Sequence, residues 1–150
     1  MKRIMIAATA KSGASPATVF ALLKDGSTWP TWAMFDSFEL ERPGRQEPFG
    51  VGAIRVFKTR VSCAREEIVE LIPDRRLSYI LLSGFPFREY RADVDLEPTD
   101  GGGTAIRWRA SFYPKYFGTG WFWRIFMALV LATIARQLAS AANHHIGHNG

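Results

Sequence analysis

The sequence contains a single cysteine, Cys63, and all three of its histidines lie beyond position 143. One cysteine cannot form a disulfide within the chain or supply a thiolate metal cluster, and we expect it to be a small buried thiol in a strand. Without an earlier histidine, no histidine-based catalytic triad can form inside the fold. His144, His145 and His148 lie close to Gly147 and without a carboxylate, so we predict no metal site and no other cofactor.

The sequence also lacks an apolar run long enough to cross a bilayer. Residues 121–135 are apolar apart from Arg124 and Thr133, and as a helix they would span about 22 Å against a hydrocarbon core of about 30 Å. The basic start at residues 1–3 is followed by too few apolar residues for a signal peptide. We therefore expect a cytoplasmic protein whose last helix is buried or lies at an interface.

Charge of one sign is not in large excess. Nineteen Lys and Arg against fourteen Asp and Glu give a net charge of +5, with 47% hydrophobic residues among 150. These values are typical of one soluble domain and exclude a disordered or fibrous chain. The small positive excess does not choose between anionic partners. We predict a single domain over residues 1–143 and a flexible tail over 144–150.

Turn residues divide the chain into helices and strands. Ser15 followed by Pro16 predicts the start of a helix, because serine can cap the first N–H groups and proline fits the first helical position. The predicted strands are 3–10, 36–43, 52–61, 63–72, 76–84, 88–97 and 104–113, and the predicted helices cover 16–25, 29–32 and 119–143.

The last two strands have the clearest pattern. Each alternates apolar and charged residues, so each presents one face to a core and one to water. Opposite charges then lie across from each other, which leaves few free arginines for nucleic acid, and we predict no nucleic-acid partner. A register of these two strands shifted by two residues would pair opposite charges nearly as well. The predicted register places Asp93, Val94 and Asp95 opposite Arg109, Trp108 and Arg107.

This order of elements predicts an α+β fold. One strand, two short helices and a six-strand antiparallel meander precede a long C-terminal helix. The sheet has one apolar face to cover, and the last helix, apolar on most sides, is its natural cover. We expect a curved seven-stranded sheet wrapped around that helix, with a cavity between them.

Several segments together resemble the START-like, or SRPBCC, superfamily, and most closely its polyketide cyclase/dehydrase-like branch. The resemblance implies the helix-grip fold with a deep apolar cavity, in a group that includes cyclases, lipid carriers and receptors. No single motif is specific, but their order covers nearly the whole chain. The segments are ASPATVF at 14–20 with Asp25, WPTW at 29–32, GVG at 50–52, EIVE at 67–70 through PDRRLSY at 73–79, and GGT at 102–104 before Trp108.

Residues on the apolar faces are the candidates for contact with a ligand. They either line a pocket or simply fill a core, and a pocket of this kind would take an acyl chain, isoprenoid, sterol or polyketide. The predicted ligand-binding residues are Trp32, Phe57, Tyr79, Arg88, Tyr90, Val94, Trp108, Phe112, Met127, Leu131 and Ile134.

Polar residues among these would orient a ligand. Arg88 shares strand parity with Tyr90, so it could point inward and pair with a carboxylate or enolate, but a strand-end arginine in water is the favoured interpretation. Tyr79 and Tyr90 could each donate a hydrogen bond to a ligand carbonyl. Arg55 and Lys58 have opposite parity, so one of the two would face inward.

Three functions fit these residues. The favoured one is binding of a hydrophobic or aromatic small molecule for carriage or sensing. An alternative is a metal-free polyketide cyclase, aromatase or dehydratase with Arg88 and Tyr90 as catalytic candidates, assisted by Tyr79 and Ser83. A second alternative is a peripheral lipid-binding protein that contacts a membrane through Trp121–Trp123. Alanines at helical spacing in the last helix could also form a homodimer contact.

Overall fold

The computed structural model describes residues 2–149, with the side chains beyond His145 left out. Seven strands form one antiparallel sheet in the order β1-β7-β6-β5-β4-β3-β2. The elements are β1 (Ile4–Ser12), α1 (Pro16–Lys24), the 3-10 turn η1 (Gly26–Thr28), α2 (Trp29–Trp32), β2 (Ser37–Arg42), β3 (Ile54–Lys58), β4 (Cys63–Ile72), β5 (Arg76–Ser83), β6 (Phe87–Pro98), β7 (Thr104–Pro114) and α3 (Gly120–Asn149).

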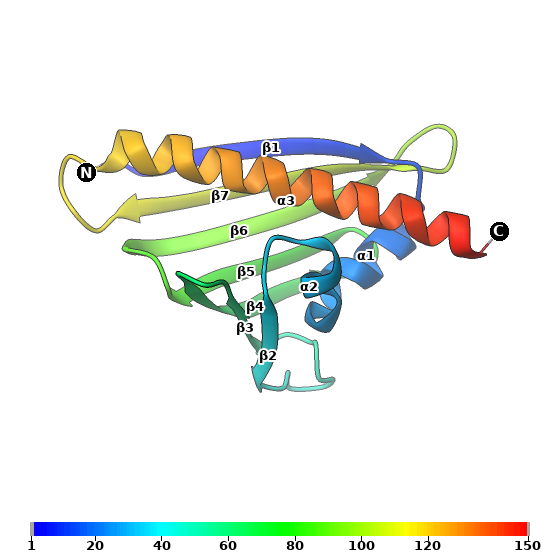
Figure 1. Cartoon of the computed structure of the whole chain (residues 1–150), viewed down its shortest axis with the longest axis horizontal. Helices are drawn as coiled ribbons and strands as arrows, with labels where there is room; N and C mark the ends of the chain where they lie inside the picture. The colour runs from blue at the N-terminus through cyan, green and yellow to red at the C-terminus, as the bar shows by residue number, and fades with distance from the viewer. Residues whose placement is uncertain (1, 150) are drawn as a thin grey trace.

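The helices lie on one face of the twisted sheet (Figure 1). Helix α3 runs along β1 and β7, and α1 packs against α3, β5 and β6. The Ser15 side chain accepts a hydrogen bond from the Thr18 N–H at 3.3 Å, and Pro16 begins α1, so the predicted start of this helix is confirmed. The predicted α+β architecture of a sheet, two short helices and a long C-terminal helix is also confirmed.

The C-terminal half of α3 is tied to the turn between β1 and α1. Asn143 Oδ1 accepts hydrogen bonds from the Gly13 N–H at 2.7 Å and from the Ser12 hydroxyl at 3.0 Å. The Ser12 hydroxyl also lies 3.0 Å from the Ala139 carbonyl oxygen. The helix continues beyond the predicted end at residue 143 to Asn149, so Gly147 does not interrupt its backbone.

Two expectations from the sequence are wrong. Over Gly120–His145, α3 is long and apolar enough to cross a membrane by length and composition, although it packs against β1, β7 and α1. The strictly apolar run ends at residue 135, but the apolar character of the helix extends beyond it. Cys63 is exposed rather than buried, because it is the first residue of β4, next to the turn that follows β3.

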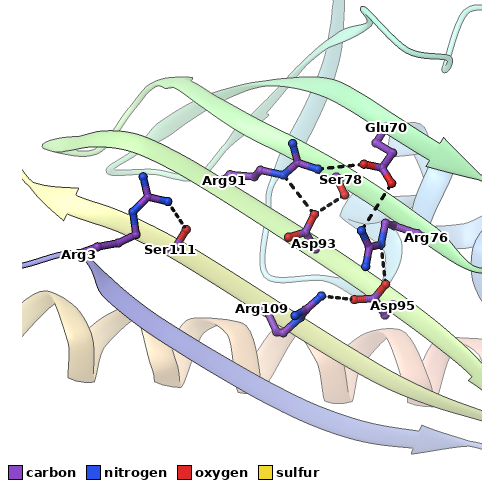
Figure 2. Close-up of polar contacts among 9 residues, drawn as sticks. All are labelled: Arg3, Glu70, Arg76, Ser78, Arg91, Asp93, Asp95, Arg109 and Ser111. Carbon is purple, nitrogen blue, oxygen red and sulfur yellow. Dashed lines mark hydrogen bonds and ion pairs between the residues drawn. The ribbon is translucent and has the colours of Figure 1, made fainter.

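The face of the sheet away from α3 carries a network of ion pairs (Figure 2). Asp95 accepts from Arg76 at 2.7 Å and from Arg109 at 2.8 Å. Arg91 lies between Asp93, at 3.2 Å, and Glu70, at 3.0 Å. The predicted register of β6 and β7 is confirmed in all three pairs. Arg76, Arg91 and Arg109 therefore have carboxylate partners, although the carboxylate that Arg109 contacts is Asp95 rather than the expected Asp93.

Ser78 is expected to make the stability of this network depend on pH. Burial alone would raise the pKa of Asp93, but the Ser78 hydroxyl and Arg91 outweigh it and hold that pKa below its usual 3.8. A carboxyl with a lowered pKa in the folded state stabilises the fold above its unfolded value, and this contribution is lost as the pH falls. Ser78→Ala should therefore cost about 1–2 kcal/mol at neutral pH, allowing for the partial exposure of Asp93.

The measurement is urea denaturation of both proteins across a pH series. The difference between wild type and Ser78→Ala should shrink as the pH falls below 3.8. Ser111→Ala is the matched control, because Ser111 lies on the same face but accepts only from the exposed Arg3. A difference that stays constant down to acidic pH would contradict the role given to Asp93.

Candidate functional site

Five neighbouring strands each contribute one large side chain to the face covered by α3. We call Arg55, Glu66, Tyr79, Tyr90 and Trp108 the interior cluster; all five residues are buried. Strand pairing places them on one face: Arg55 lies opposite Glu66, and Tyr79 lies opposite Ala92. The cluster is the main polar feature of an interior otherwise built from aromatic and aliphatic groups.

Arg55 joins α1 to the sheet. Its Nη2 donates to Glu66 Oε1 at 2.9 Å, and its Nη1 donates to the carbonyl oxygens of Leu23 and Lys24 at 3.0 and 3.3 Å. Those carbonyls end α1, where a positive charge is favourable. The guanidinium carbon lies 5.1 Å from the centre of the Trp29 ring. The Arg55 Nε is buried without a hydrogen-bond partner.

Glu66 is held in an environment that disfavours its charge. Burial raises the pKa of Glu66, and the neighbouring Arg55 guanidinium only partly opposes this effect. Breaking a buried ion pair is costly, yet the intact pair often stabilises a fold no better than apolar side chains of the same volume. Arg55 and Glu66 are therefore poorly explained by stability alone.

The two tyrosines are neutral hydrogen-bonding groups at the centre of the cluster. Tyr79 accepts a hydrogen bond from Trp108 Nε1 at 3.2 Å, and its ring centre lies 6.3 Å from that of Tyr90. Burial, with a smaller contribution from the charge of Glu66, raises the pKa of both tyrosines above the usual 10. Both hydroxyls thus keep their protons at physiological pH and act as donors rather than bases.

Aromatic rings connect the cluster to the surface at the beginning of α3. We call the partly exposed Phe85, Phe87 and Trp123 the aromatic rim. Phe87 lies edge-on to Trp123, with ring centres 5.0 Å apart, and stacks on Tyr90 at 5.8 Å. Phe85 contacts both other members of the rim. A continuous set of rings therefore leads from the surface to the polar centre.

Most of the predicted ligand-binding residues come together around this cluster, but they are tightly packed. Val94, Trp108, Phe112 and Phe57 have no accessible surface, so no water-sized space adjoins them. The open cavity expected from the sequence is therefore not seen around these residues, and Trp29, which sequence reasoning did not include, fills part of that space. Tyr79, Tyr90, Met127, Leu131 and Ile134 are 1–5% exposed.

Two hollows among the described residues lie away from these side chains. One of about 600 Å³ lies between α2 and the C-terminal half of α3, and Trp32 lines it together with Gln137 and His144. Another, of about 1000 Å³, lies on the charged face of the sheet beside Arg76 and Asp95. Trp32 thus lines the first of these hollows with one side and contacts Trp29 with its ring, at a centre distance of 5.0 Å.

Arg88 lies in water, as favoured for a strand-end arginine, so its place among the predicted ligand-binding residues is wrong. Its side chain is exposed because a bulge between Arg88 and Arg91 changes the alternation of β6, with Glu89 at a φ of 52°. Phe87 and Tyr90 consequently both face inward, although they are three positions apart. Arg55 is the inward-facing cation, and Lys58 and Ser83 are exposed.

No group of three or more His, Cys, Asp and Glu side chains that could hold a metal ion is found among the described residues. The side chain of His148, which the sequence analysis considered as a ligand, lies outside them.

Comparison with solved structures assigns the fold. A START superfamily protein from Mycobacterium smegmatis is similar with a TM-score of 0.81 at 12% identity, covering 94% of this chain and 98% of that one. A Thermobifida fusca protein solved by NMR has a TM-score of 0.75 at 22% identity, covering 93% of each chain. Ara h 8.0201 has a TM-score of 0.68 at 16% identity, covering 94% of this chain and 98% of its own. The expected helix-grip fold is confirmed.

Comparison with sequences gives the family. No curated protein matches the sequence. A family model described as polyketide cyclase/dehydrase and lipid transport matches residues 3–144, nearly the whole chain. The chain therefore belongs to the polyketide cyclase/dehydrase and lipid transport family.

Proposed function

We propose that the protein binds a hydrophobic small molecule with one polar acceptor group, for carriage or sensing, with its apolar part between the sheet and α3. The observation that carries the proposal is the fully buried Arg55, whose Nε lacks a partner inside an apolar interior. A buried donor without an acceptor is costly and uncommon. A ligand carbonyl or carboxylate near Arg55 and the tyrosine hydroxyls would supply the missing acceptor.

Binding requires that side chains move, because the interior is closed around the predicted contact residues. The aromatic rim is the part with room to move, since its three rings are only partly buried. Gly84, with a φ of 123°, lies directly beside the rim in the turn between β5 and β6. We therefore place the route of the ligand between this turn and the first turns of α3.

A reaction has less support than binding. Arg88, the expected partner of Tyr90 in a cyclase or dehydratase, faces solvent across the bulge in β6. The raised pKa values of Tyr79 and Tyr90 make these residues donors and exclude them as general bases at neutral pH. The interior cluster can therefore orient a carbonyl group, but no observation favours bond breaking there.

The test is titration of delipidated protein with oleate, with the methyl ester of oleate and with an aromatic probe, followed by tryptophan fluorescence. We expect saturable binding of at least one probe. Tyr79→Phe and Tyr90→Phe should each weaken it by about 2–12-fold, the equivalent of one hydrogen bond. Tyr113→Phe is the matched control, because Tyr113 lies on β7 outside the interior cluster. Absence of saturable binding for acyl, sterol and aromatic probes alike would overturn the proposal.

A further inference from the structure

The first turns of α3 carry a large apolar surface that no other part of the described chain covers. Trp121 is 70% exposed, Ile125 57% and Leu129 64%. Phe122 and Phe126 are also exposed. We call these five residues the α3 apolar face. Phe117, in the loop before α3, is 91% exposed and lies beside it. Contiguous exposed apolar surface of this kind marks an interaction site.

The apolar character is confined to one half of the helix. Continuing along the same side at helical spacing, α3 exposes Arg136, Ser140 and Asn143 instead. The change from apolar to polar therefore occurs after Leu129. An exposed side with no role beyond forming the helix would be expected to be polar along its whole length.

Positively charged side chains lie beside the α3 apolar face. An open hollow of about 570 Å³ beside it is lined by Lys2, Trp121 and Arg124. Lys115 lies just before α3, with its Nζ 5.7 Å from the Tyr116 ring centre. After Asp100 the sequence contains no acidic residue at all. Apolar side chains within a cationic border match the surface of a bilayer that contains anionic lipids.

The arrangement favours a membrane over a second copy of the chain. The chain start, the loop after β7 and the beginning of α3 lie together at one end of the molecule (Figure 1), so the cations and the apolar face can approach one plane. Two copies packed through this face would bring like charges such as Lys2 and Arg124 together without acidic partners from α3, which is unfavourable.

We propose that the α3 apolar face docks the protein onto the surface of an anionic lipid bilayer. The consequence for ligand transfer rests on the proposed function. Phe122 and Phe126 of this face contact Trp123 of the aromatic rim, with ring centres 5.0 and 5.7 Å apart. Docking therefore brings the rim to the lipid, where a hydrophobic ligand can pass between bilayer and interior without crossing water.

The experiment is flotation of the full-length protein with vesicles of phosphatidylcholine alone or mixed with phosphatidylglycerol. Wild type should float with the anionic vesicles and be released by high salt, which screens the cations. The double variant Trp121→Ser/Leu129→Ser should lose at least ten-fold in vesicle affinity. Arg124→Gln should lose about five-fold. Arg136→Gln, which removes the same charge from the polar half, and Val61→Ser, at another exposed apolar position, are the controls.

All these positions are exposed, so the variants should keep the wild-type melting temperature. Equal flotation with both vesicle types, or none, would overturn the proposal. So would a wild-type dimer in gel filtration that becomes a monomer in the double variant, because the face would then bind a second copy. Oleate titration without vesicles separates the two proposals, since the double variant should still bind the probe in solution.

Discussion

Replacing Arg55 by alanine is expected to lower the free energy of unfolding by about 3–5 kcal/mol. The change leaves Glu66 buried without its cation and removes the donor from the Leu23 and Lys24 carbonyls at the end of α1. Urea denaturation followed by tryptophan fluorescence measures the loss. The double variant Arg55→Leu/Glu66→Leu should recover most of the stability, because it removes both charges.

The stability of the Arg55→Ala variant should also depend more strongly on pH than that of the wild type. The pKa of Glu66 is already raised by burial, and loss of Arg55 would raise it further. Above pH 4.5, the usual pKa of a glutamate, the Glu66 carboxyl is then deprotonated in the unfolded chain but still protonated in the folded chain. The free energy of unfolding therefore falls as the pH rises through this range. Arg65→Ala, which breaks an exposed pair with Glu41, is the control for the loss of stability. It should lower the free energy of unfolding far less than Arg55→Ala. Equal losses for the two variants would contradict the buried nature of the Arg55 pair.

Trp108→Ala should cost about 3–5 kcal/mol, because it removes a fully buried ring that protein atoms surround. The substitution also removes the hydrogen bond to the Tyr79 hydroxyl. The prediction tests whether the interior is filled. A ring beside an open, hydrated cavity would leave no new void when truncated, so its loss would be much smaller.

The same denaturation experiment measures this change. Trp121→Ala is the matched control, since Trp121 is 70% exposed and its loss should change stability by no more than about 0.5 kcal/mol. A small effect of Trp108→Ala would show that the space between the sheet and α3 is open, contrary to the packing described here.

Local patterns predicted those parts of the fold that depend on neighbours in sequence or on charge. The cap at Ser15 and the pairing of Asp93 with Arg109 are examples, because each depends on residue types at fixed spacing. Strand parity made Arg88 a ligand-binding candidate because it assumes an unbroken strand. One additional residue at the bulge beside Glu89 exchanges the inward and outward faces for the residues of β6 that precede it.

Parity predicted the inward direction of the two tyrosines and Trp108 in the interior cluster, but it could not predict the pair of Arg55 and Glu66. Arg55 and Glu66 belong to different strands, and neither is unusual within its own strand. Their opposition follows from the register of β3 and β4, which was not among the predictions. The packing of the interior could not be predicted either. Alternation indicates which face of the sheet a side chain occupies, but not whether another residue, such as Trp29, fills the space on that face.

The hydrogen bonds of Asn143 have a mechanical consequence. They fix α3 near its C-terminal end, while its first turns are held mainly by aromatic and aliphatic contacts. Any tilt of α3 as a rigid rod must therefore pivot close to Asn143. The displacement grows with distance from that point and is greatest beside Trp123, so a small rotation would separate the rings of Phe87 and Trp123 and leave α1 in place.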